Sequence, residues 1–140
     1  MAKKESVSTT WIGNMAFETQ VNGHKIIIDA ESAFGGEDRG PRPKLLMLSA
    51  LGGCTAMDIV AILKKMRVDI EGLNVIVEGD LTEEHPKHFF KMHIIYEFRG
   101  KNLQVDKLQK AIDLSSEKYC GVSASYRKAM ELTSEIRILE

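Results

Sequence analysis

The stretch PKLLMLSALGGCTAMDIVAILKKMR, which runs from Pro43 to Arg67, decides the fold of this chain. Proline suits the first turn of a helix because its missing N–H would have had no partner there. The residues from Leu45 to Leu51 are apolar on every side, which is typical of a helix that is buried all round. The second half becomes amphipathic and leaves one polar face. The stretch therefore predicts a long central helix from Pro43 to about Arg67.

Such a helix constrains the assembly as well as the fold. A chain of 140 residues is too small to cover every face of a long apolar helix. A partner subunit is the simplest cover for the remaining faces. The sequence therefore predicts an obligate dimer.

The segments around this helix predict a mixed fold. Asn22 and Gly23 suit a hairpin turn, and the polar segment from Glu31 to Pro43 is expected to be a loop. Strands are expected at Val7–Phe17, Lys25–Ala30, Val75–Leu81, Phe89–Phe98 and Leu132–Leu139, and further helices at Leu103–Tyr119 and Val122–Met130. Strands and helices come in blocks, which favours a single α+β domain over residues 1–140 with largely antiparallel sheets.

Composition and charge exclude several classes of partner. The formal net charge is −1 and the isoelectric point is near 6.4, so neither nucleic acid nor an anionic membrane is expected as a partner. The first residues, Met1 to Ser6, contain no apolar leader. The longest apolar stretch, Leu45 to Met57, is interrupted by small and polar residues and is shorter than the ~20 residues of a membrane span. We expect a cytoplasmic protein.

The chain has two cysteines, Cys54 and Cys120, which lie 66 positions apart. A structural disulfide between them is not expected in a reducing compartment. Cys54 directly follows Gly52 and Gly53, and each glycine costs a helix interior about 0.5–1 kcal/mol relative to alanine. Close approach of another element would explain the pair, and so would access of a small ligand to the sulfur. The alternative is that Cys54 simply packs in the core, as free cysteines often do.

The other candidate residues carry weaker signals. Cys120 follows a predicted helix and precedes Gly121, where a thiol is either accessible or a half-buried cap. His85 and His88 lie in a turn without a third ligand nearby, so neither a metal nor a cofactor is expected. Asp58 lies one helical turn after Cys54 on the same face, and the sequence assigns it no role.

Two segments resemble a known family. The segment from Gly40 to Asp58 looks like the central helix of OsmC-like proteins, and the segment from Asp113 to Val122 resembles that family's second cysteine motif. Spacing and strand order are similar over essentially the whole chain, which looks closest to the uncharacterised OsmC-like branch of the OsmC/Ohr superfamily. The resemblance implies the OsmC-like fold, with largely antiparallel sheets packed around the central helix. It also implies an intertwined homodimer with its sites at the interface.

The resemblance also implies an activity. In the family, the first cysteine attacks hydrogen peroxide or an organic hydroperoxide and becomes a sulfenic acid. The second cysteine then forms a disulfide with it, and an external dithiol reductant restores both thiols. Carried over by motif, Cys54 is the peroxidatic residue and Cys120 the resolving residue. The expected function is that of a thiol-dependent peroxidase in oxidative-stress defence.

The sequence departs from the family at two activating positions. The family's early-strand arginine is absent from Gly13-Asn14-Met15, and Lys44 follows Pro43 where the family has a glutamate. A cation near the sulfur would still favour the thiolate. Arg39, Arg42 and Lys44 are the local candidates, and we take Arg39 and Arg42 as candidate catalytic residues. The alternative is that these residues simply lie on a solvated basic loop and have no catalytic role.

The missing pair keeps two other hypotheses open. One is a non-catalytic OsmC-like dimer that binds an apolar small molecule at its interface. The other is a structural relic in which both thiols are merely buried. Titration of the thiols before and after peroxide treatment distinguishes the peroxidase from both.

Overall fold

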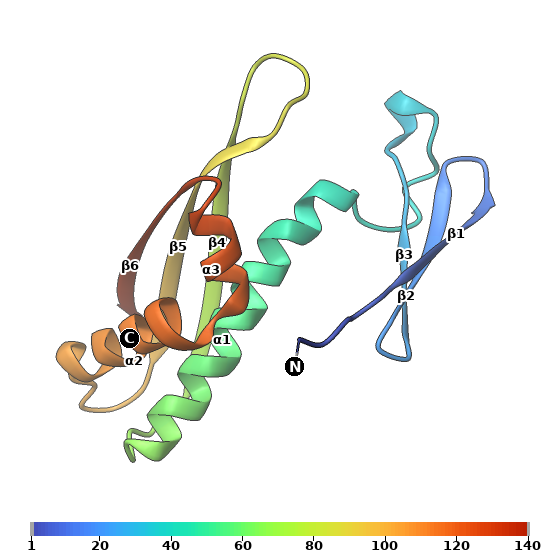
Figure 1. Ribbon diagram of the computed structural model, residues 1–140. Helices are drawn as coiled ribbons and strands as arrows, with labels where there is room; N and C mark the ends of the chain where they lie inside the picture. The colour runs from blue at the N-terminus through green and yellow to red at the C-terminus, as the bar shows by residue number, and fades with distance from the viewer. Residues whose placement is uncertain (1, 140) are drawn as a thin grey trace. The chain divides into compact units, whose positions relative to one another are not determined.

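The computed structural model describes residues 2–139, and the chain forms two compact units that divide between Met47 and Leu48. The N-terminal unit contains β1 (Ser8–Gly13), β2 (Ala16–Val21), β3 (His24–Ile28) and short 3₁₀ turns at Ser32–Phe34 and Pro43–Leu45. The helix α1 (Leu46–Lys65) starts at the boundary. The C-terminal unit continues with β4 (Gly72–Leu81), β5 (Phe89–Arg99), α2 (Val105–Leu114), a π-helical turn at Ser115–Tyr119, α3 (Gly121–Arg127) and β6 (Glu131–Leu139) (Figure 1).

The N-terminal unit is a three-stranded antiparallel sheet in the order β1-β2-β3. The prediction of one strand from Val7 to Phe17 was wrong, because the chain reverses after β1. Gly13 and Asn14 adopt positive φ angles of +114° and +51° there, a conformation that glycine and asparagine tolerate best. The predicted hairpin at Asn22 and Gly23 is confirmed, with φ angles of +54° and +82° between β2 and β3.

The C-terminal unit has a second three-stranded sheet with β5 in its centre. β4 pairs with β5 antiparallel, whereas β6 pairs with β5 in parallel. The parallel pairing requires a crossover, which α2 and α3 provide. The fold is therefore α+β with largely antiparallel sheets, as predicted. The alternating residues of β5 that fill the core are Met92, Ile94, Tyr96 and Phe98.

The helix α1 packs alongside β4, on the face of the sheet that carries these β5 core residues (Figure 1). Val75 and Val77 of β4 lie opposite Tyr96 and Ile94 of β5, so all four side chains share one face. A Cβ atom on Gly52 would lie 3.4 Å from the Cγ2 atom of Val77. Close approach of another element therefore accounts for the first glycine of the pair.

Within the C-terminal unit, one face of α1 is buried and the other faces are not. The buried side chains include Leu51, Ile59 and Leu63, and burial of each contributes about 1.5–3 kcal/mol. On other faces Met57 is 76% exposed and Val60 is 49% exposed. The C-terminal unit by itself therefore leaves part of the apolar surface of α1 uncovered, and this is the surface from which the dimer is predicted.

The apolar run in this region is longer than Leu45 to Met57. The helical segment Pro43–Lys65 contains a window of mean hydropathy 1.9, so by length and composition alone it could cross a membrane. One such helix is weak evidence for a membrane protein, because core helices of water-soluble domains pass the same test. Here one face of the helix packs on β4 and β5.

The predicted helix from Leu103 to Tyr119 is present, but its last turn is altered. The α-helical part ends at Leu114 and the chain continues as the π-helical turn Ser115–Tyr119. Cys120 then adopts an extended conformation before α3 begins at Gly121. Short π-helical segments occur frequently at functional sites, which directs attention to Cys120.

Candidate active site

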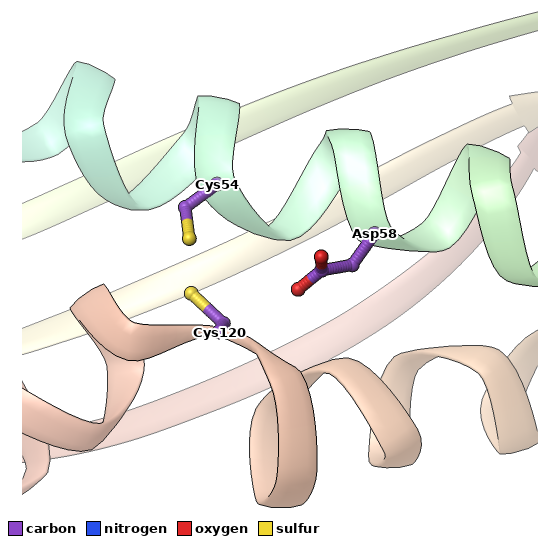
Figure 2. Close-up of side chains that lie close together, drawn as sticks. All are labelled: Cys54, Asp58 and Cys120. Carbon is purple, nitrogen blue, oxygen red and sulfur yellow. The ribbon is translucent and has the colours of Figure 1, made fainter. Parts of the chain in front are cut away.

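The structure brings together the two cysteines that the sequence analysis singled out. Cys54 lies in the middle of α1, and Cys120 lies between the π-helical turn and α3. Their sulfur atoms and a carboxylate oxygen of Asp58 all lie within 4.8 Å of one another. Figure 2 shows the two sulfurs pointing toward each other, with the Asp58 carboxylate beside them. Both cysteines are free thiols.

Backbone hydrogen bonds hold Cys120 in place. Its N–H donates to the carbonyl of Ser115 at 2.7 Å, which closes the π-helical turn. Its sulfur accepts a hydrogen bond from the N–H of Ser123 at 3.3 Å, so Cys120 caps the first turn of α3. Cys120 is buried. The sulfur is therefore fixed by the two helical segments on either side of it.

Asp58 is held beside the thiols by Ser115. The Ser115 hydroxyl donates to the Asp58 carboxylate at 2.9 Å, and Ser115 is fully buried. Because Asp58 follows Cys54 by four residues, the two side chains lie on the same face of α1. This spacing was the available sequence signal for Asp58, whereas no local pattern pointed to Ser115.

Comparisons with known proteins identify the family. Residues 35–135 match the family of OsmC-like proteins. This chain belongs to the OsmC-like family. It is 32% identical to protein YhfA of Escherichia coli strain K12 over 130 residues, which cover 92% of this chain and 94% of that protein.

Solved structures agree with this assignment. A hypothetical protein from Aquifex aeolicus VF5 superposes with a TM-score of 0.83 at 28% identity, over 99% of this chain and 100% of that one. The organic hydroperoxide resistance protein OhrB of Bacillus subtilis superposes with a TM-score of 0.64 at 18% identity, over 94% of this chain and 96% of that one. The second likeness shows a shared fold.

In this OsmC-like protein, a buried tyrosine lies close to Cys120. Tyr96 of β5 is buried and forms a side-chain hydrogen bond with Thr55 of α1. Burial is the main cause that raises the pKa of Tyr96 to about 12; the hydrogen bond with Thr55 partly opposes this effect, and charge on Cys120 adds to it. Tyr96 therefore stays neutral at physiological pH and adds no charge next to Cys120. The alternation of β5 predicted its burial, but not its place next to Cys120.

The surroundings of Cys54 disfavour its thiolate. Burial raises its pKa, as do the hydrogen bond with Cys120 and the negative charges on Cys120 and Asp58, whereas the N–H of Val122 lowers it. The net effect is a pKa above the ordinary value of 9.0. Cys54 is therefore mostly a thiol at neutral pH, and its thiolate population grows as the pH rises.

The two predicted arginines have structural contacts within the N-terminal unit. The Arg42 guanidinium donates to the carbonyl of Gly40 at 2.7 Å and forms an ion pair with Asp38. The backbone N–H of Arg39 donates to the Asp29 carboxylate at 3.1 Å. Both residues therefore stabilise the loop that precedes α1. Their assistance to Cys54 stays a prediction.

A groove in the C-terminal unit reaches the site. Asp58 lines it at one side, and most of the other walls are apolar. The remaining lining residues are Ala61, Ile62, Lys65, Met66, Lys110, Leu114 and Tyr119. A small molecule with an apolar body can therefore reach the carboxylate beside the two thiols.

Replacing Asp58 with Asn tests the electrostatics of the site. Removing the carboxylate removes one of the charges that raise the Cys54 pKa, so the alkylation profile should move to lower pH. In a Cys120→Ser background, where Cys54 is the sole cysteine, alkylation by iodoacetamide at neutral pH should become about two- to threefold faster. Asp113→Asn, which changes an exposed carboxylate on α2, should leave the profile in place. If the alkylation profile of Asp58→Asn is unchanged or moves to higher pH, the Asp58 charge does not raise the pKa of Cys54 and the prediction is wrong.

Proposed function

We propose that this OsmC-like protein is a thiol-dependent peroxidase that reduces organic hydroperoxides or hydrogen peroxide in oxidative-stress defence. The observation that supports the proposal is the position of the two sulfurs, which lie within 4.8 Å of each other although the cysteines are 66 positions apart in the chain. Because an S–S bond is only ~2.05 Å long, the two sulfurs must move closer together, and formation of the disulfide requires a small shift of the helices that carry them. Structural neighbours named as organic hydroperoxide resistance proteins agree with this chemistry.

The reaction proceeds in three steps. The Cys54 thiolate attacks one peroxide oxygen, the O–O bond breaks, and the released alkoxide or hydroxide takes a proton from solvent. The Cys54 sulfur is now a sulfenic acid, and the Cys120 thiol attacks it to form a disulfide. The hydroxyl group leaves together with the thiol proton as water. An external dithiol reduces this disulfide by thiol–disulfide exchange and is itself oxidised.

The raised pKa of Cys54 sets the pH dependence of the first step. Only the thiolate attacks the peroxide, and the thiolate fraction increases as the pH approaches the pKa from below. The rate of peroxide reduction therefore rises with pH through the neutral range. A cation next to Cys54 would relieve this requirement, which is the role proposed for Arg39 or Arg42.

A second candidate function is non-catalytic binding of an apolar small molecule by a dimer. The raised pKa of Cys54 favours it, because a protonated thiol is a poor nucleophile. An apolar groove between α1 and β4, lined in part by Leu48, Gly52, Val75 and Val77, also favours it. Peroxide-resistant thiols would support this function over the peroxidase.

We also propose that the protein acts as a cytoplasmic homodimer. The exposed apolar side chains of α1 are the surface that a second subunit would cover. Leu48 of α1 is half-buried, so part of its side chain remains exposed, and it also packs toward the core of its own unit, because its Cδ2 atom lies 3.0 Å from where a Cβ atom on Gly79 would stand. This double role makes Leu48 the position of choice for testing the assembly.

Replacing Leu48 with Asp should unfold the protein rather than release folded monomers, because obligate dimers often lack a stable folded monomer. Circular dichroism reports the loss of helix, and sedimentation equilibrium reports the mass of the wild type. The wild type should be a dimer at every concentration tested. A stable folded wild-type monomer at micromolar concentration contradicts the dimer.

The cysteine variants separate the roles of the two thiols. Cys120→Ser should stop the reaction at a sulfenic acid on Cys54, which dimedone traps and excess peroxide oxidises further. Cys54→Ser should leave Cys120 unmodified by the same hydroperoxide. Peptide mass spectrometry measures both outcomes. A dimedone adduct on Cys120 of the Cys54→Ser variant would reverse the assignment.

The arginine variants test the proposed activation. If Arg39 or Arg42 assists Cys54, its replacement by Ala should raise the thiol pKa, since a cation within ~4–6 Å favours the charged form. The measurement is the pH profile of Cys54 alkylation in the wild type and the two variants. Circular dichroism confirms that each variant is folded. If the alkylation profile of neither variant differs from that of the wild type, neither arginine replaces the family's arginine next to Cys54, and the proposed activation is wrong.

A further inference from the structure

We propose that Cys54, Cys120 and Asp58 form a binding site for one thiophilic divalent metal ion, with Zn²⁺ as the probe. Within residues 2–139, these three side chains form a cluster whose ligand atoms all lie within 4.8 Å of one another. Two sulfurs and one carboxylate oxygen are ligands that zinc takes in proteins. The proposal goes beyond the peroxidase and does not depend on it, because coordination requires only the reduced thiols.

The spacing of the three atoms suits a tetrahedral ion. Two sulfurs bound to one zinc at ~2.3 Å each lie ~3.8 Å apart. The ligand atoms, at up to 4.8 Å from one another, therefore need to approach by at most about 1 Å. Because Ser123 holds the Cys120 sulfur, the movement required is a rotation of the Cys54 and Asp58 side chains. Three protein ligands leave the fourth position to water or a small ligand.

The surroundings already orient two of the three ligands. The Ser115 hydroxyl donates to one oxygen of Asp58 at 2.9 Å, which leaves the other oxygen for the ion. The Ser123 N–H donates to the Cys120 sulfur at 3.3 Å. Contacts of this kind fix the geometry of metal ligands and strengthen binding. The site is therefore supported by residues of the π-helical turn and α3.

The charges of the cluster also favour a cation. Zinc binds the two cysteines as thiolates, so binding releases two thiol protons to solvent and leaves a complex of net charge −1. The ion compensates the mutual repulsion of the two thiolates and the carboxylate. No electron is transferred. The bound ion occupies the same sulfur electron pairs that attack a peroxide, so metal binding and disulfide formation exclude each other.

The histidines offer the competing place for a metal. His85 and His88 lie in an exposed turn, and the Nδ1 atom of His88 is hydrogen-bonded to the carbonyl of Pro86 at 2.9 Å. Two surface histidines without a third ligand bind zinc weakly. The double replacement His85→Ala and His88→Ala is therefore a matched control for binding outside the thiol cluster.

The test titrates the fully reduced, full-length protein with Zn²⁺ against a chromophoric chelator. The wild type and the histidine control should each bind one ion per chain. Cys54→Ser, Cys120→Ser and Asp58→Asn should weaken binding by more than the ~10–100-fold that loss of an outer-shell contact causes. Ser115→Ala should weaken it by about tenfold. Equal binding by the wild type and both cysteine variants would overturn the proposal.

Two further measurements on the wild type need no variant. Co²⁺ in place of Zn²⁺ should give a sulfur-to-metal charge-transfer band and the visible spectrum of a tetrahedral ion. Zinc should also protect both thiols from alkylation. Absence of the charge-transfer band together with unchanged alkylation would reject the site. Because these readouts use no peroxide, failure of the peroxidase proposal leaves their result unaffected.

Discussion

The packing of α1 on the C-terminal sheet is the interaction on which the rest of the site depends. Leu51, Thr55, Ile59 and Leu63 recur every four residues and are buried against the sheet, which fixes the rotation of the helix about its axis. Cys54 and Asp58 each precede one of these buried residues by one position. At about 100° per residue they therefore lie at the margin of the buried face, where α3 and the π-helical turn meet it. A different rotation of α1 would separate Cys54 from Cys120.

The site combines a favourable geometry with an unfavourable electrostatic setting. The thiols lie close enough for redox chemistry. Burial, the neighbouring Cys120 and the charge on Asp58 nevertheless all oppose ionisation of Cys54. Cys54 therefore remains a protonated thiol until a cation or a higher pH favours its thiolate. The same excess of negative charge is what makes the cluster suitable for a metal ion. Asp58 is thus the residue whose charge distinguishes this site from a simple pair of cysteines.

Sequence reasoning predicted the features that local chemistry determines. Pro43 and the apolar run after it predicted the central helix, and Asn22 with Gly23 predicted a hairpin that is present. It missed the reversal at Gly13 and Asn14, because the β-rich residues on both sides read as one strand. The shared family supplied the expectation that Cys54 and Cys120 meet, since nothing in the chain between them sets their distance.

The remaining parts of the site depend on contacts that leave no local pattern. Ser115 bonds to Asp58 across 57 positions of sequence, and Tyr96 meets Thr55 from another element. Helical periodicity placed Asp58 on the face of Cys54 but could not show that a serine would hold it there. The sequence already showed that the family's arginine is absent. The structure was needed to show that burial raises the pKa of Cys54, which is the effect that a nearby cation would oppose.

The most direct test of the central claim is the fate of the two thiols in the wild-type protein. The reduced chain is treated with one equivalent of an organic hydroperoxide, and free thiols and intact mass are measured together. The account predicts that both thiols disappear, that the mass falls by two hydrogens, and that an external dithiol reverses both changes. Two free thiols that survive an excess of peroxide would contradict it.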